Sequence, residues 1–170
     1  MRKLGFWFAA LLLGLIMFGG SCANGPAKDE QEIRELENRF AAAFKAKDIE
    51  TIMKGYAPGA ELFVFDVTPP RQHVGFDDYK KDWQDFFAAF PGPVDKFEVR
   101  DLSIETDGKL AYSHSIQPAI VTGKDGLKFS LTVRVTDGYR KVNGKWLITQ
   151  EHVSVPVDLA SGNPDLASRP

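Results

Sequence analysis

The chain has 170 residues with 21 basic and 23 acidic side chains, which gives a net charge of −2. Because the charge is nearly balanced and no basic stripe is present, the composition argues against nucleic-acid binding. The length suffices for one domain with a real core, and an aromatic content of 12% is enough both to build that core and to line a pocket.

Residues 1–22 have the features of an export signal. A positively charged start precedes an apolar run over residues 4–18, which is too short to span a membrane comfortably. Cys22 lies where a bacterial lipoprotein carries its lipidated cysteine, although Gly19 stands where Leu is usual. Ordinary signal peptidase cleavage after Ala23 is the alternative. We therefore expect an exported protein, either periplasmic or an outer-membrane lipoprotein, with a secreted soluble form as the alternative. Its only membrane contact would be the lipid anchor.

The rest of the chain divides into three expected parts. These are a tether over residues 23–29, one domain over residues 30–157 and a flexible tail over residues 158–170. Within the domain, helical patterns come first and strand patterns follow. This order predicts an α+β fold in which the helices cover one face of an antiparallel sheet.

Three helices are expected at the start of the domain. Apolar residues at helical spacing over residues 33–44 predict the first helix. Asp48 is expected to cap a second, short helix over residues 49–56. Gly75 opens the third, whose apolar stripe spans residues 76–90.

Asp66 ends an apolar run over residues 62–65 that is typical of a buried strand, and Pro69 follows almost at once. A buried carboxylate must be paired, reach water or stay protonated, so Asp66 is a candidate site residue. The alternative is that Asp66 only begins the turn toward Pro69.

Four segments in which apolar and polar residues alternate follow the third helix. An Asp-Gly or Asn-Gly pair lies between each segment and the next, as tight hairpins require. The predicted strands span residues 97–105, 110–121, 127–139 and 146–155. In the third of these, alternation places Val133 and Asp137 on the covered face, so Asp137 extends an apolar row as Asp66 does. A bulge at Gly138 is the alternative explanation for Asp137.

His114 and His152 are either structural or catalytic, and a lone His on a covered face is more often structural. Alternation puts His152 on the same face as Trp146, and His114 on the same face as Tyr112. A short return over residues 71–74 is expected to pair with the strand that ends at Asp66, and His73 within it is expected to lie on the surface. The His and acid spacings match no metal motif, and no phosphate loop or nucleophile motif is present, so neither a metal nor a cofactor is expected.

The order of elements and several motifs resemble the nuclear transport factor 2-like superfamily, most closely its SnoaL-like and ketosteroid isomerase-like members. The similarity covers about residues 30–157, and its most characteristic part is the ending Asn143-Gly-Lys-Trp-Leu-Ile-Thr-Gln-Glu-His-Val-Ser154. Further matching motifs are Phe44-Lys-Ala-Lys-Asp48, Phe65-Asp-Val-Thr-Pro-Pro-Arg71 and Arg134-Val-Thr-Asp137. The resemblance implies a curved sheet wrapped on helices, which forms a cone with an apolar cavity.

The resemblance also suggests roles for individual residues. In ketosteroid isomerases one Asp moves a proton while a Tyr and a protonated Asp stabilise the enolate. Asp66 falls near the proton-moving Asp and Asp137 near the oxyanion-hole acid, but Phe40 stands at the Tyr position and lacks the hydroxyl donor. A steroid isomerase is therefore not expected, whereas related acid/base chemistry is.

We thus expect a pocket that binds a small apolar or aromatic molecule, with isomerase- or cyclase-like chemistry by Asp66, Asp137 and His152. The residues expected to contact the ligand are Phe40, Tyr56, Phe63, Trp83, Tyr112, His114, Val133 and Trp146. The alternatives are a non-catalytic ligand-binding module and an association module, with a homodimer formed through the outer sheet face at Thr132, Arg134 and Thr136.

Overall fold

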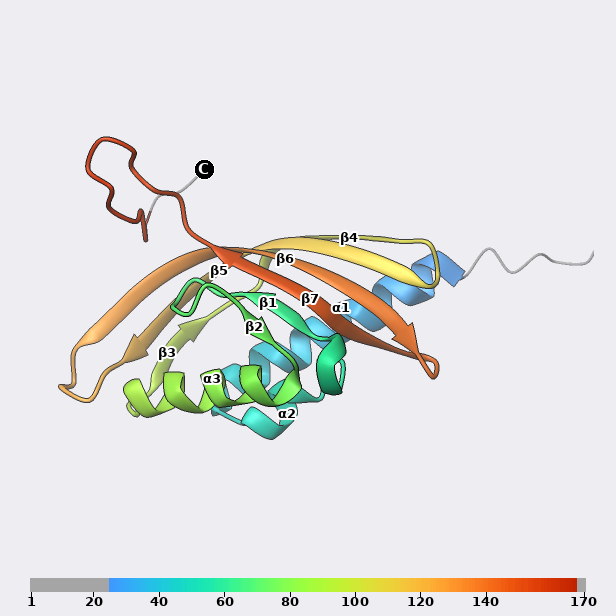
Figure 1. The fold of residues 1–170 in the computed structure, drawn as a ribbon, viewed down its shortest axis with the longest axis horizontal. Helices are drawn as coiled ribbons and strands as arrows, with labels where there is room; N and C mark the ends of the chain where they lie inside the picture. Colours follow the sequence, from blue (N-terminus) through green and yellow to red (C-terminus); the bar gives the residue numbers. More distant parts are fainter. Residues whose placement is uncertain (1–24, 168–170) are drawn as a thin grey trace, which may run out of the picture.

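The computed structural model describes residues 25–167 (Figure 1). The helical elements are α1 (Gly25–Ala46), α2 (Ile49–Met53), the single-turn 3-10 helix η1 (Gly59–Glu61) and α3 (Phe76–Ala89). The strands are β1 (Phe63–Phe65), β2 (His73–Val74), β3 (Val94–Phe97), β4 (Arg100–Thr106), β5 (Leu110–Thr122), β6 (Lys128–Val142) and β7 (Lys145–Ser154). The expected export signal and Cys22 lie outside the described residues. No helix within residues 25–167 is both long and apolar enough to cross a membrane.

All seven strands belong to one curved sheet with the order β2-β1-β7-β6-β5-β3, and β4 also pairs with β5. The long strands β5, β6 and β7 arch over α3, as Figure 1 shows. Every pairing is antiparallel except that of β1 with β7, which is parallel. The structure therefore confirms the α+β fold with helices on one face of a curved sheet.

The first predicted long strand is broken in two. β3 pairs with β5 around Ala119, whereas β4 pairs with β5 closer to the start of that strand, and the register shifts between Arg100 and Ser103. Asp101 adopts a φ of 53°, which interrupts the extended backbone at this point. Alternating side chains alone do not reveal such a break.

The expected tether is helical where the structure describes it, because α1 begins at Gly25. Asp29 in its first turns is buried and accepts a hydrogen bond from Nε1 of Trp146 at 3.2 Å and another from the ammonium group of Lys141. The Lys141 hydrogen bond is the main cause that lowers the pKa of Asp29. This cluster ties the start of α1 to the sheet.

The expected tail folds back onto the domain instead of running free over residues 158–167. The Thr132 backbone N–H donates to the Leu166 carbonyl at 2.9 Å, and Val157 forms an isolated bridge with Pro164. β7 pairs with β6 only from Arg134 onward, so the edge of β6 before that residue is open to the returning chain. The returning chain therefore satisfies a strand edge that β7 is too short to cover.

The core lies between the helices and the concave face of the sheet. Its centre is an aromatic cluster in which the rings of Phe44 and Phe97 stack at a centroid distance of 4.1 Å. Trp83 meets Phe44 edge-on at 5.7 Å. This cluster joins α1, α3 and β3 and forms one end of the pocket described next.

Candidate functional site

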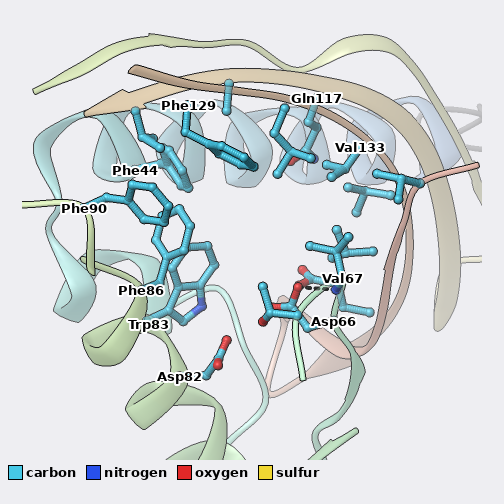
Figure 2. Close-up of a pocket in the computed structure, with 18 of the residues that line it drawn as sticks. Phe44, Asp66, Val67, Asp82, Trp83, Phe86, Phe90, Gln117, Phe129 and Val133 are labelled. Atoms are coloured by element: carbon cyan, nitrogen blue, oxygen red, sulfur yellow. Dashed lines mark hydrogen bonds between the residues drawn. The ribbon is translucent and has the colours of Figure 1, made fainter. Parts of the chain in front are cut away.

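A cavity of about 400 Å³ lies between α1, α3 and the concave face of the sheet (Figure 2). One wall is aromatic and carries Phe40, Phe44, Trp83, Phe86 and Phe90. The opposite wall is formed by aliphatic side chains of β5, β6 and β7, and the returning C-terminal segment adds Pro164 and Leu166. The volume is in the range of small-molecule sites, which begin at about 300 Å³.

Two carboxyl groups from different elements meet at one end of this cavity. Asp66 follows β1, Asp82 comes from α3, and both line the cavity, as Figure 2 shows. Burial and the neighbouring charge of Asp66 raise the pKa of Asp82 to about 6. The Asp66 side chain also accepts a hydrogen bond from the backbone N–H of Val67. A carboxyl pair of this kind can hold one proton at near-neutral pH.

His73 stands behind this pair, and the expectation that it lies on the surface is wrong. The residue is only 3% exposed because β2 pairs with β1 and places His73 opposite the buried Val64. Its Nε2 lies 3.6 Å from Oδ1 of Asp82, and its Nδ1 lies 3.3 Å from Oδ2 of Asp78. Neither nitrogen meets the geometry of a hydrogen bond to any described residue. A strand of two residues is too short for alternation to show which of its side chains is buried.

Glu151 is a further acid of the cavity lining, and the sequence analysis did not identify it. It is buried, accepts a hydrogen bond from the Tyr56 hydroxyl at 2.8 Å and accepts another from the Tyr79 hydroxyl. Burial is the largest cause that raises the pKa of Glu151 to about 7, while the two tyrosine hydrogen bonds oppose it. Because this pKa lies near neutral pH, Glu151 can act as a second proton donor or acceptor at the cavity.

The reason for this omission is a bulge in β7. Gly138 pairs with Gln150, whereas Tyr139 pairs with Ile148, so one extra residue of β7 lies between these pairs. Beyond the bulge the strand faces are exchanged, and Glu151 turns inward in place of Gln150. The apolar residues Val153 and Val155, which are out of phase with Ile148, were the available indication.

Asp137 is buried as predicted, but it lies behind the cavity wall and not in the lining. Burial, and after it the charges of Glu151 and Glu37, raise the pKa of Asp137 well above its usual range. Tyr139 donates to Glu37 at 2.7 Å, and its hydroxyl also lies 2.8 Å from the Ser113 hydroxyl. Asp66 and Asp137 therefore do not face each other across one open cavity.

The predicted ligand contacts separate into two groups. Phe40, Trp83 and Val133 line the cavity, as expected. Tyr56 and Trp146 are buried but are not in the lining: Tyr56 donates a hydrogen bond to Glu151 and Trp146 donates one to Asp29. Phe63 packs against Phe65 at a ring distance of 5.0 Å and is not in the lining.

For three further predicted site residues, the side chain lies on the opposite face of the sheet from the one expected. Tyr112 is 47% exposed and His114 is exposed, because β5 buries Ala111, Ser113 and Ser115 instead. His152 is exposed on the far side of the β7 bulge. Arg134 and Thr136 are exposed on the same outer face, and a dimer formed there stays a prediction.

Comparison with known proteins agrees with this architecture. The family model of the SnoaL-like domain matches residues 33–158. A solved nuclear transport factor 2-like protein of unknown function from Pseudomonas putida has 28% sequence identity and a TM-score of 0.76, over 85% of this chain and 98% of that chain. A candidate dehydratase of the same structural family from Streptomyces avermitilis has 17% identity and a TM-score of 0.67, over 84% of this chain and 99% of that chain. The latter likeness is one of fold alone. No curated protein sequence matches the chain.

Proposed function

The chain belongs to the SnoaL-like domain family, and from this premise we propose that it binds a small apolar or aromatic molecule in the cavity and moves a proton at the Asp66–Asp82 end. The observation that carries this proposal is the placement of two interacting carboxyl groups, one with a pKa of about 6, at the end of an aromatic cavity. Near neutral pH such a pair offers a proton acceptor and a proton donor side by side.

The chemistry that this pair supports is reversible proton transfer at a carbon next to a carbonyl group. The ionised carboxyl group takes the proton from carbon, the electron pair moves into an enolate, and a proton returns from the carboxylic acid. Isomerisation follows if the proton returns to a different carbon, and elimination follows if a hydroxyl group leaves as water. Glu151, with a pKa of about 7, is the second group that can supply a proton.

A non-catalytic binding module is the second candidate. Phe40 favours it, since this ring contacts Trp83 and Phe97 at centroid distances of 5.8 and 5.7 Å and offers the cavity no hydroxyl group. The same cavity then holds the molecule without changing it. In both candidate functions the cavity binds the same kind of molecule, and only the first includes proton transfer.

Tetralone, an aromatic two-ring ketone, separates the two candidates. Native mass spectrometry measures its binding, and NMR in heavy water follows exchange of the protons next to its carbonyl. We expect binding and exchange with the wild-type protein, and a loss of exchange by at least about 100-fold in Asp66→Asn and Asp82→Asn. Binding without exchange supports the non-catalytic module, whereas the absence of binding contradicts the whole proposal.

We also propose that the protein is exported and that Cys22 carries the lipid. The support is the sequence pattern of residues 1–22. Metabolic labelling with a fatty acid is expected to mark the wild-type protein and not Cys22→Ser. Equal labelling of both proteins, or of neither, contradicts lipidation.

A further inference from the structure

Trp83 carries a buried hydrogen-bond donor that no described residue satisfies. Its side chain lies on α3, lines the cavity and is 9% exposed, and its Nε1 atom has no partner within residues 25–167. Trp146, the other tryptophan in this range, donates its Nε1 hydrogen to Asp29 at 3.2 Å. Buried polar groups are almost always paired, so the unpaired indole N–H of Trp83 calls for an explanation.

Aromatic side chains pack against Trp83, and no acceptor among residues 25–167 forms a hydrogen bond with its indole N–H. Phe44 and Phe40 meet the indole edge-on at centroid distances of 5.7 and 5.8 Å, and the rest of that wall is aromatic. Figure 2 shows the nitrogen-bearing edge of the indole directed toward the part of the cavity where Asp82 and Asp66 lie. A ligand oxygen at this end would meet the indole N–H on one side and the carboxyl pair on the other.

The charged residues of the cavity lining limit which chemical groups the ligand can carry. Asp66, Asp82 and Glu151 line the cavity, and no Lys, Arg or His of the described chain does. An anionic ligand is therefore disfavoured by like charge. An ammonium group would suit the carboxylates but has no lone pair to accept from Trp83. A hydroxyl group accepts from the indole and donates to a carboxylate, and a carbonyl oxygen accepts from the indole and from a protonated carboxyl group.

We propose that Nε1–H of Trp83 donates a hydrogen bond to the oxygen of the ligand, and that the ligand is a neutral apolar ring bearing a hydroxyl or carbonyl group. This inference rests on the proposed function, because it specifies what the same cavity binds. In proton transfer next to a carbonyl, the indole N–H also stabilises the oxygen as it gains negative charge.

The test compares naphthol with methylnaphthalene, which has nearly the same shape but no oxygen. Calorimetry measures both affinities in the full-length wild-type protein and in Trp83→Phe, which keeps an aromatic ring and removes the donor. We expect Trp83→Phe to weaken naphthol binding by about tenfold and methylnaphthalene binding by less than about twofold. Loss of both affinities by equal factors indicates that Trp83 only packs against the ligand, and overturns the inference.

A second measurement does not depend on how the variant folds. In the wild-type protein the indole N–H proton of Trp83 is expected to move downfield on addition of naphthol and not on addition of methylnaphthalene. The Trp146 indole, already bonded to Asp29, is the internal control and should not move. If both probes bind and the Trp83 resonance responds equally to each, the inference alone fails. If the wild-type protein binds neither probe, the proposed function fails with it.

Discussion

The imidazole of His73 lies between two carboxyl groups of α3, with Nε2 3.6 Å from Oδ1 of Asp82 and Nδ1 3.3 Å from Oδ2 of Asp78. The charge of His73 lowers the pKa of Asp82, whereas burial and the charge of Asp66 raise it, and the balance leaves this pKa at about 6. His73 therefore helps to set how far Asp82 is ionised at neutral pH, without being part of the cavity lining.

Replacement of His73 by Gln is expected to raise the pKa of Asp82 further, because the variant removes the charge that favours the carboxylate. The pH profile of tetralone exchange should shift upward by roughly 0.5–1 unit. His114→Gln is the matched control, since that histidine is exposed on the outer face of β5. A profile that is identical in His73→Gln and the wild-type protein would show that His73 is only a packing residue.

Asp82 is expected to make the folded state less stable as the pH rises. Its pKa is raised by burial and by Asp66 from 3.8 to about 6, so the folded protein holds this proton more tightly than the unfolded chain. The stabilisation is complete below about pH 4 and is lost as the pH rises through about 6. Asp82→Asn should then be more stable than the wild-type protein at pH 8 by about 1 kcal/mol, a value reduced for solvent screening of this partly exposed group.

Urea unfolding at pH 5 and pH 8 measures this difference. Asp85→Asn is the control on the same helix, because Asp85 is exposed, forms a surface ion pair with Lys81 and contributes less than burial or Asp66 to the raised pKa of Asp82. Its effect should stay within about 0.5 kcal/mol at both pH values. The stability advantage of Asp82→Asn over the wild-type protein should be larger at pH 8 than at pH 5. An equal or smaller advantage at pH 8 contradicts the raised pKa of Asp82.

Glu151 is expected to give a second pH-dependent loss of stability, centred closer to neutrality. Its pKa rises from 4.5 to about 7 on folding, chiefly through burial. The proton that stabilises the folded state is therefore lost as the pH rises through about 7, at a cost on the order of 2–3 kcal/mol. Glu151→Gln keeps an acceptor for Tyr56 and Tyr79 and has no charge, so its stability should change less between pH 5 and pH 8.

Denaturant unfolding of Glu151→Ala provides the comparison for this prediction. Alanine leaves the buried hydroxyls of Tyr56 and Tyr79 without their acceptor, which costs about 1–3 kcal/mol for each unpaired group. We expect Glu151→Ala to be less stable than Glu151→Gln at every pH. Equal stability of the two variants would mean that the tyrosine hydrogen bonds contribute nothing.

Regular periodicity explains which parts of the fold and the site were accessible from the sequence. Helical spacing located Phe40 and Trp83, and strict alternation along β6 placed Val133 and Asp137 on the concave side of the sheet. These positions follow from local geometry, because side-chain directions repeat regularly along a helix or a strand. The position of Asp66 at the cavity also followed from its place at the end of an apolar strand.

The remaining site residues depend on departures from regularity. One extra residue in β7 moved His152 outward and brought Glu151 into the cavity. His73 is buried because β2 pairs with β1, and a strand of only two residues shows no alternation from which its buried side chain could be told. Asp82 becomes a site residue only because α3 faces the end of β1, which is a tertiary relationship.

The returning C-terminal segment offers the last prediction, because one of its leucines lines the cavity and another does not. Leu166 contributes to the lining, whereas Leu159 is 96% exposed. Leu166→Ala removes apolar surface from the binding site and should weaken methylnaphthalene binding by roughly 3–10-fold. Leu159→Ala deletes the same atoms from a side chain that is exposed to solvent, so the affinity should change by less than about twofold. Calorimetric affinities of the two variants decide the matter: if they are equal, residues 158–167 do not form part of the working site.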